Sequence, residues 1–323
     1  MRTAPSPARR SWTPTALVAV TLLACSGAGE TGETAGDAED ITDAVFANRS
    51  ADCADYVGAY TAAARDLQRD QGFTATVRVS DDGERCVIES NTIPNHDFND
   101  ESASFATPVA EIDRALELPR NPSAAAEPTP LALSSFDAIM LNGVVVDIFS
   151  AGCWGVGDGI IGCFDVNTPW RRDPMHPSNT FGADAHNAHS QPDGTYHYHG
   201  DPMSMWDDNP GDNGSPVIGF AADGFPIYGS YFNDNGTLRK AVSGYELKQG
   251  ARPEEPDGPG GVYDGTYIDD FEYTGNGDLD ECNGMTVDGQ YGYYITDAYP
   301  WILRCYHGTP DESFNKMMGG PPP

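Results

Sequence analysis

Histidines are concentrated in one short part of this 323-residue chain. Four of the seven lie between positions 186 and 199, namely His186, His189, His197 and His199, and the last two belong to the segment YHYH at 196–199. Imidazole nitrogens are ligands for copper, zinc, nickel and iron. The cluster therefore predicts a site for one transition-metal ion, with a purely polar hydrogen-bond network as the alternative.

A short hairpin would bring three of these side chains onto one face. The residues PDG at 192–194 fit a three-residue loop with glycine in the left-handed position. In that register His189 lies opposite His197, and His199 shares their face because residues two apart in a strand point the same way. Cross-strand Cβ atoms would then lie about 5 Å apart. Three imidazoles at this separation are a plausible ligand set for a single ion.

The same alternation assigns the neighbouring side chains. Tyr196 and Tyr198 should point to the opposite face, into the core, and anchor the strand. His186 is a fourth candidate ligand, although it falls on the wrong face unless the chain turns there. His96 and His307 lie far away in the sequence and would join the site only if folding brings them in.

Methionines near the motif bear on the identity of the metal. Met203 and Met205 follow the motif, and Met175 adjoins His176. Thioethers favour Cu(I), so we expect copper in preference to zinc, although methionines also fill gaps in cores. Ligating histidines must be neutral, so the affinity should fall below about pH 6.5.

A second group of candidate ligands is acidic. The segment NGDLDECNG at 276–284 places Asp278, Asp280 and Glu281 close together, between glycines. Closely spaced oxygen ligands suit calcium, although the spacing is not that of an EF-hand. The alternative is a turn whose carboxylates cap backbone amides.

The N-terminus is typical of an exported precursor. Arginines at the start are followed by an apolar run at 16–24, far shorter than the roughly 20 residues of a membrane-spanning helix. The run ends in LLAC at 22–25, which resembles a bacterial lipobox. We therefore expect a lipoprotein signal peptide at 1–24 and a lipid anchor on Cys25, with ordinary cleavage near Ala24 as the alternative. The predicted location is the cell envelope, at the outer membrane or cell surface.

Cysteine counting agrees with export. Six cysteines remain after Cys25, and an even number in an exported chain indicates disulfides. Their proximity along the chain suggests three pairs: Cys53–Cys86, Cys153–Cys163 and Cys282–Cys305. Thiolate metal ligation is the alternative, although no CxxC motif occurs.

The charge balance is strongly acidic. The chain has 49 Asp and Glu against 18 Lys and Arg, a formal net charge of −31. Such a surface repels nucleic acid and favours cations. Nucleic acid is therefore excluded as a partner, and a metal ion and a membrane reached through the lipid anchor are the expected ones.

Local patterns predict a mostly β fold with a helical N-terminal piece. Apolar residues at spacings of three and four predict a helix over 53–71, and alternation predicts a strand over 73–80, followed by a hairpin turn at Asp82-Gly83. Residues 133–152 are predicted to form two strands around Asn142-Gly143. The expected fold class is thus α+β: one irregular, loop-rich, disulfide-stabilised domain over 43–312. A flexible acidic tether at 25–42 and a disordered tail at 313–323 would flank it.

Several long motifs occur in a fixed order along this domain: SNTIPNHDF (90–98), LNGVVVD (141–147), GTYHYHGDP (194–202), PVIGFAADGFPIYGSY (216–231), SGYELKQGARP (243–253), YDGTYIDDFEY (263–273), GDLDECNG (277–284) and YYITDAYPWILRCYHG (293–308). Together they resemble the bacterial YHYH-domain family over roughly residues 50–310. The resemblance implies an exported domain but no activity.

Function must therefore come from the residues. We expect an exported, lipid-anchored protein that binds copper or zinc through the histidine cluster. A metal-dependent enzyme is the alternative, either a hydrolase that uses metal-activated water or a copper oxidoreductase, with Asp193, Asp201 or Asp223 as the base of the hydrolase. A structural or carbohydrate-binding surface module is the further alternative.

Overall fold

The computed structural model describes residues 38–207 and 209–316. The predicted signal peptide, Cys25 and most of the tether lie outside the described residues. Within them the chain contains 19 strands and three short 3-10 helices, and no α-helix. No helix of the described part is long and apolar enough to cross a membrane.

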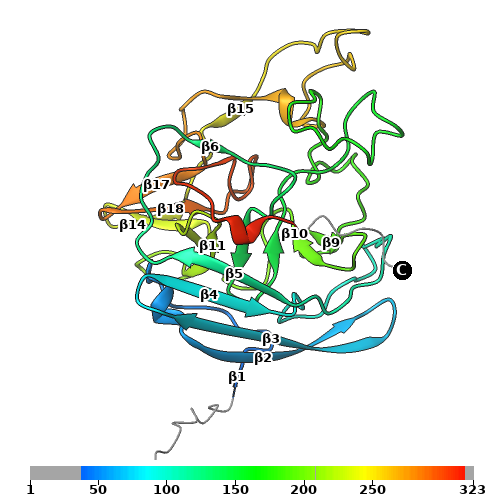
Figure 1. Cartoon of the computed structure of the whole chain (residues 1–323). Coiled ribbons are helices and arrows are strands. Elements are labelled where there is room, and N and C mark those ends of the chain that lie inside the picture. Colours follow the sequence, from blue (N-terminus) through cyan, green and yellow to red (C-terminus); the bar gives the residue numbers. More distant parts are fainter. Residues whose placement is uncertain (1–37, 208, 317–323) are drawn as a thin grey trace, which may run out of the picture. The chain divides into compact units, whose positions relative to one another are not determined.

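The N-terminal sheet has five strands in the order β1-β2-β3-β4-β5 (Figure 1). Their bounds are β1 (Glu39–Asp40), β2 (Gly58–Asp66), β3 (Gln71–Asp81), β4 (Arg85–Ser90) and β5 (Arg114–Pro119). Alternation in β3 buries Ala75, Val77 and Val79 and exposes the residues between them. The hairpin turn predicted between β3 and β4 is present, with Gly83 at φ +97°.

The predicted helix over 53–71 is wrong. A single 3-10 turn, η1 (Cys53–Tyr56), is followed directly by β2, which pairs with β3 along its whole length. The alanine-rich segment satisfies both a helical spacing and a period of two, and the latter buries Ala62, Ala64 and Asp66. Pairing with the β-branched strand β3 outweighs the helical propensity of alanine. The fold is therefore nearly all β rather than α+β.

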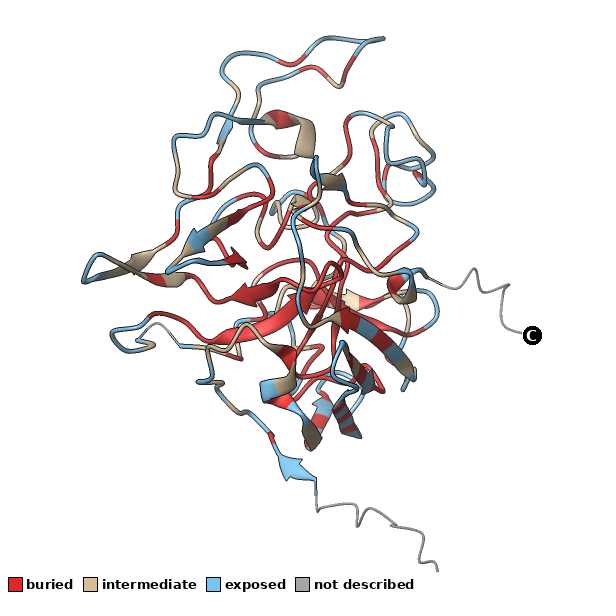
Figure 2. Ribbon diagram, turned by 60° about the vertical axis from the view of Figure 1, so that its left-hand side comes forward, coloured by how far each residue is buried: buried red, intermediate tan, exposed pale blue. Residues whose placement is uncertain are grey.

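The second sheet has eight strands and carries the YHYH segment. Its order is β17 (Gly284–Val287), β18 (Gln290–Tyr294), β12 (Pro226–Tyr228), β11 (Val217–Ala221), β7 (Ala138–Met140), β8 (Val145–Val146), β10 (Tyr196–Tyr198) and β9 (Ala188–Ser190). Five of these strands, β7, β8, β10, β11 and β12, are buried at every position and are drawn in red in Figure 2, whereas the strands of the N-terminal sheet alternate in colour. Strand β9 forms one edge, so the hairpin β9–β10 lies at a boundary of the sheet.

Short elements complete the domain. Three two-stranded sheets pair β6 (Thr129–Pro130) with β19 (Cys305–Tyr306), β13 (Tyr231–Asp234) with β14 (Thr237–Lys240), and β15 (Tyr245–Leu247) with β16 (Phe271–Tyr273). The other 3-10 turns are η2 (Ile268–Asp270) and η3 (Glu312–Phe314). Long connections join these elements, as expected for a loop-rich chain.

The structure contains the three predicted disulfides. Cys53–Cys86 ties η1 to β4, Cys153–Cys163 closes a loop, and Cys282–Cys305 ties the turn before β17 to β19. Each crosslink stabilises the fold by roughly 2–4 kcal/mol, mainly by restricting the unfolded chain.

Described structure is present on both sides of residues 43–312. Strand β1 pairs with β2 inside the stretch expected to be a tether, and Ile41 is buried. At the other end Phe314 is fully buried, and Lys316 forms an ion pair with Asp147. Ile41 and Phe314 both belong to one continuous core. Each is surrounded by polar residues in the sequence, so the sequence pattern does not indicate that it is buried.

Candidate metal centre

The β9–β10 hairpin has the predicted register. His189 pairs with His197, the Gln191 amide donates to the Thr195 carbonyl over 2.8 Å, and the His199 amide donates to Asn187 over 2.9 Å. Gly194 closes the loop at φ +93°, a conformation that favours glycine.

The three imidazoles converge. The Nε2 atom of His199 lies 3.1 Å from Nε2 of His197 and 3.1 Å from Nε2 of His189. Two nitrogens bound tetrahedrally at 2.0–2.1 Å from one ion would be about 3.3 Å apart. His197 and His199 are 2% and 3% exposed, while His189 is half-buried. These ligand atoms can therefore hold one ion with only a small adjustment.

The second nitrogen of His189 and of His197 shows which atom of these rings carries the proton. His189 Nδ1 lies 2.7 Å from the Phe181 carbonyl, and His197 Nδ1 lies 3.3 Å from that of Thr195. A carbonyl only accepts hydrogen bonds, so both Nδ1 atoms are the donors and both Nε2 atoms hold a lone pair. His199 Nδ1 is buried and has no hydrogen-bond partner among the described residues. With the proton on Nδ1 of His199 as well, the Nε2 lone pairs of all three rings point toward one position.

Burial keeps these rings neutral. Desolvation lowers the pKa of His189, and it lowers the pKa values of His197 and His199 well below the ordinary value, with repulsion between the rings adding to the effect. Neutral imidazole is the form that binds a metal. The proton therefore competes with a metal only at a lower pH than for a free imidazole, which moves the expected limit of pH 6.5 downward.

Both tyrosines of the motif point inward, as predicted. Tyr196 and Tyr198 are fully buried. The Tyr196 hydroxyl donates to Asp184 over 2.9 Å. The Tyr198 hydroxyl accepts from Asn142 Nδ2 over 2.9 Å and lies 2.7 Å from His96 Nε2. These buried bonds fix the strand that presents the histidines.

The other candidate histidines lie elsewhere. His186 stacks on His96 with 3.7 Å between ring centroids, and its Nδ1 bonds to the Pro202 carbonyl. A tight turn ending at Asn187, which has φ +56°, carries His186 away from the triad. His307 stacks on Tyr291 with a centroid distance of 3.8 Å. The structure therefore does not join His186, His96 or His307 to the cluster.

The three methionines near the motif lie in different surroundings and do not identify the metal. Met205 is buried in the hydrophobic core and Met203 is 63% exposed. Met175 packs directly on Gly200, the residue after His199. Of the three thioethers, this one is placed beside the motif.

Sequence reasoning missed three polar residues next to the triad, namely Asp147, Gln191 and Lys316. Strand β8 runs parallel to β10 with Tyr198 opposite Val146, and the Asp147 amide donates to the Tyr198 carbonyl over 3.0 Å. Asp147 therefore shares the face of the histidines. Its Oδ2 accepts from Gln191 over 2.6 Å and from Lys316. An acid directly after the apolar run of LNGVVVD was the available signal.

The three acids considered as a catalytic base are engaged elsewhere. Asp193 is half-exposed and pairs with Arg114. Asp201 accepts from the Trp206 indole over 3.2 Å. Asp223 accepts from the Tyr293 hydroxyl over 2.6 Å.

The acidic segment forms a turn rather than a calcium site. Asp278 forms a bidentate ion pair with Arg239, and Asp280 accepts from the Cys282 and Gly284 amides. Glu281 is exposed. Among the described residues, the histidine triad is the sole group with metal-ligand spacing apart from Asp52, Cys53 and Cys86, whose cysteines form a disulfide. The calcium prediction is therefore not supported.

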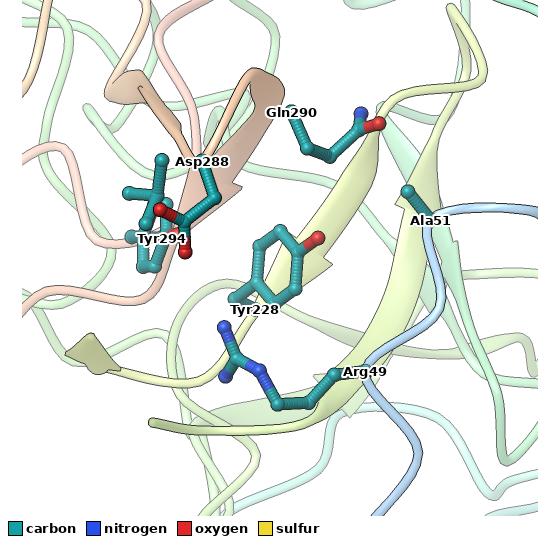
Figure 3. A pocket seen from close by; sticks show the side chains of 7 residues that line it. Arg49, Ala51, Tyr228, Asp288, Gln290 and Tyr294 are labelled. Atoms are coloured by element: carbon teal, nitrogen blue, oxygen red, sulfur yellow. The ribbon is translucent and has the colours of Figure 1, made fainter. Parts of the chain in front are cut away.

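A separate cavity of about 310 Å³ lies between Arg49, Tyr228, Asp288, Gln290 and Tyr294 (Figure 3). Tyr228 stacks on Tyr294 with 5.1 Å between centroids, and Arg49 lies over the Tyr228 ring. The two rings are 5% and 1% exposed. No open ring face remains in this cavity on which a sugar could stack, so it gives no support to a carbohydrate-binding module.

The chain was compared with known families, curated proteins and solved structures. Residues 115–308 match the family model described as YHYH protein. No curated protein and no solved structure matches the chain. The matched segment includes the three histidines of the triad and Asp147.

Proposed function

Since the chain belongs to the YHYH protein family, and the motif supplies two of three convergent imidazoles, we propose that the protein binds one transition-metal ion through His189, His197 and His199. The observation that carries the proposal is the convergence of the Nε2 atoms within 3.1 Å of His199 Nε2. Lone pairs at this separation repel one another unless a cation lies between them.

A hydrogen-bond network explains the same contacts less well. His199 would need its proton on Nε2, where one hydrogen would be shared between two acceptors. Its Nδ1 would then be a buried acceptor without a partner among the described residues. A metal ion instead uses all three Nε2 lone pairs at once, and it leaves in place the Nδ1 bonds of His189 and His197 to carbonyls, which are typical of histidines that bind metals.

Copper is the ion that we favour in the proposal. Imidazole suits both copper and zinc, and a thioether adds a preference for Cu(I). Met175, which packs on Gly200, supports copper, and zinc is the alternative that elemental analysis separates.

We place this site on an exported, lipid-anchored protein. Three disulfides support folding in an oxidising compartment. The anchor on Cys25 rests on the lipobox-like segment LLAC alone.

Elemental analysis of protein purified without metal-affinity resin tests the proposal. We expect about one copper or zinc ion per wild-type chain, and loss of that ion in His189→Gln and His197→Ala variants that keep the wild-type circular dichroism. The matched control is His176→Ala, because His176 lies outside the triad and bonds to Ser178. Wild-type protein that contains no metal and takes up none on titration with Zn²⁺, Cu²⁺ or anaerobic Cu⁺ would refute the site.

A further inference from the structure

The triad by itself leaves a charge uncompensated. Three neutral imidazoles around a divalent ion form a centre with two positive charges, and His197 and His199 are almost fully buried. A buried charge is costly unless an opposite charge lies nearby. The described residues supply such a charge in Asp147, which is 6% exposed.

Asp147 reaches the centre through strand pairing. His197 lies opposite Val145 and Tyr198 opposite Val146 in the parallel pair β8–β10, so the next pair in this register is His199 and Asp147. The Asp147 carboxylate and the His189 ring are close enough to act electrostatically on each other. Gln191, two residues after His189, donates to Asp147 Oδ2 over 2.6 Å and fixes its orientation.

Two further groups set the net charge around Asp147. The Lys316 ammonium, from the segment after η3, pairs with Asp147 Oδ2 and acts on both His197 and His199. Asp137 is also buried near Asp147, and burial and this neighbouring carboxylate raise the pKa of Asp137. The ion pair with Lys316 therefore partly neutralises the Asp147 carboxylate.

We propose that Asp147 is a positioning residue of the metal centre: its carboxylate, oriented by Gln191 and partly neutralised by Lys316, sets the affinity for the bound cation. This inference rests on the proposed metal site. It predicts that removing the negative charge weakens binding and that removing the positive charge strengthens it.

Metal affinities of two variants with opposite charge changes test the proposal. Competition titration with Zn²⁺ should show a 10–100-fold weaker affinity for Asp147→Asn, the range for groups that orient or tune metal ligands without touching the metal. Lys316→Met should bind Zn²⁺ several-fold more tightly. Structural damage would weaken both variants, so opposite signs separate charge from packing. The control is Asp193→Asn, an acid in the same hairpin that pairs with Arg114, and its affinity should stay within threefold of wild type.

The charge of the ion provides a second readout. Coulomb energy is proportional to the ion's charge, so the fold-change for monovalent Ag⁺ should be about the square root of that for Zn²⁺. Equal fold-changes for the two ions, unchanged affinity in Asp147→Asn, or weaker binding in Lys316→Met would each overturn the proposal. A wild-type protein that binds neither ion would refute the metal site itself, which is a different result.

Discussion

Replacing Tyr198 by phenylalanine removes one hydroxyl from the buried side of strand β10. His96 bonds through Nδ1 to the Asp97 carbonyl, so Nδ1 carries the proton and Nε2 is an acceptor. The Tyr198 hydroxyl therefore donates to His96 Nε2 over 2.7 Å and accepts from Asn142 over 2.9 Å. In the variant, Asn142 keeps its bond to Asn95 Oδ1 over 3.1 Å, whereas His96 Nε2 loses its partner.

The expected loss of stability follows from that imbalance. A buried acceptor left unsatisfied costs about 1–3 kcal/mol, and the aromatic ring that fills the core is unchanged. We expect the free energy of unfolding to fall by about 1–3 kcal/mol. Truncation of Tyr198 to alanine should cost about 3–5 kcal/mol, because it also removes the ring.

Urea unfolding with the disulfides intact measures this difference. EDTA is included so that bound metal does not contribute, and tryptophan fluorescence reports the transition. The control is Tyr228→Phe, because Tyr228 is 5% exposed and its hydroxyl makes no hydrogen bond within the described part of the chain. The free energy of unfolding of this control should change by no more than about 0.5 kcal/mol. Zn²⁺ affinity of Tyr198→Phe should stay within threefold, since the hydroxyl lies on the face away from the histidines. A loss below about 0.5 kcal/mol in Tyr198→Phe would show that this network does not hold the motif.

Two further predictions concern acid and the membrane. Burial lowers the pKa values of His189, His197 and His199. Metal affinity, measured by Zn²⁺ competition titration, should therefore stay constant from pH 8 to about 6.5 and decline only below that pH. A decline that begins above pH 7 would contradict the burial of these three histidines. If Cys25 carries a lipid, Cys25→Ser should move the protein from the membrane fraction to the soluble fraction or block its maturation. Fractionation and immunoblotting measure this, and equal membrane recovery of both forms would exclude the anchor.

The predictable parts of this site depend on local register. The loop residues Pro192-Asp193-Gly194 determine which residues of β9 and β10 face each other, and the period of two in YHYH separates histidines from tyrosines. All of this information lies within one hairpin. The histidine triad could therefore be predicted from the sequence, whereas His186 could not be excluded because its position depends on a turn at Asn187.

The N-terminal piece shows the opposite case. Residues 53–71 satisfy a helical spacing and a strand spacing at once, and the outcome depends on pairing with β3. Local propensity cannot decide between such patterns when a neighbouring strand offers a full ladder of hydrogen bonds. The disulfide Cys53–Cys86 is compatible with either structure, so the correct prediction of that pair did not reveal the wrong helix.

The charge around the triad depends on contacts that no local pattern contains. Asp147 reaches the histidines through the parallel pairing of β8 with β10, and Lys316 reaches Asp147 from the far end of the chain. Asp147 and the histidines lie inside the segment 115–308 that matches the family, whereas Lys316 lies beyond it. The proposed ligands and Asp147 thus belong to the family segment, while Lys316, which we expect to oppose metal binding, does not. If Lys316→Met tightens binding as expected, the affinity of this centre is adjusted by a residue outside the segment that builds it.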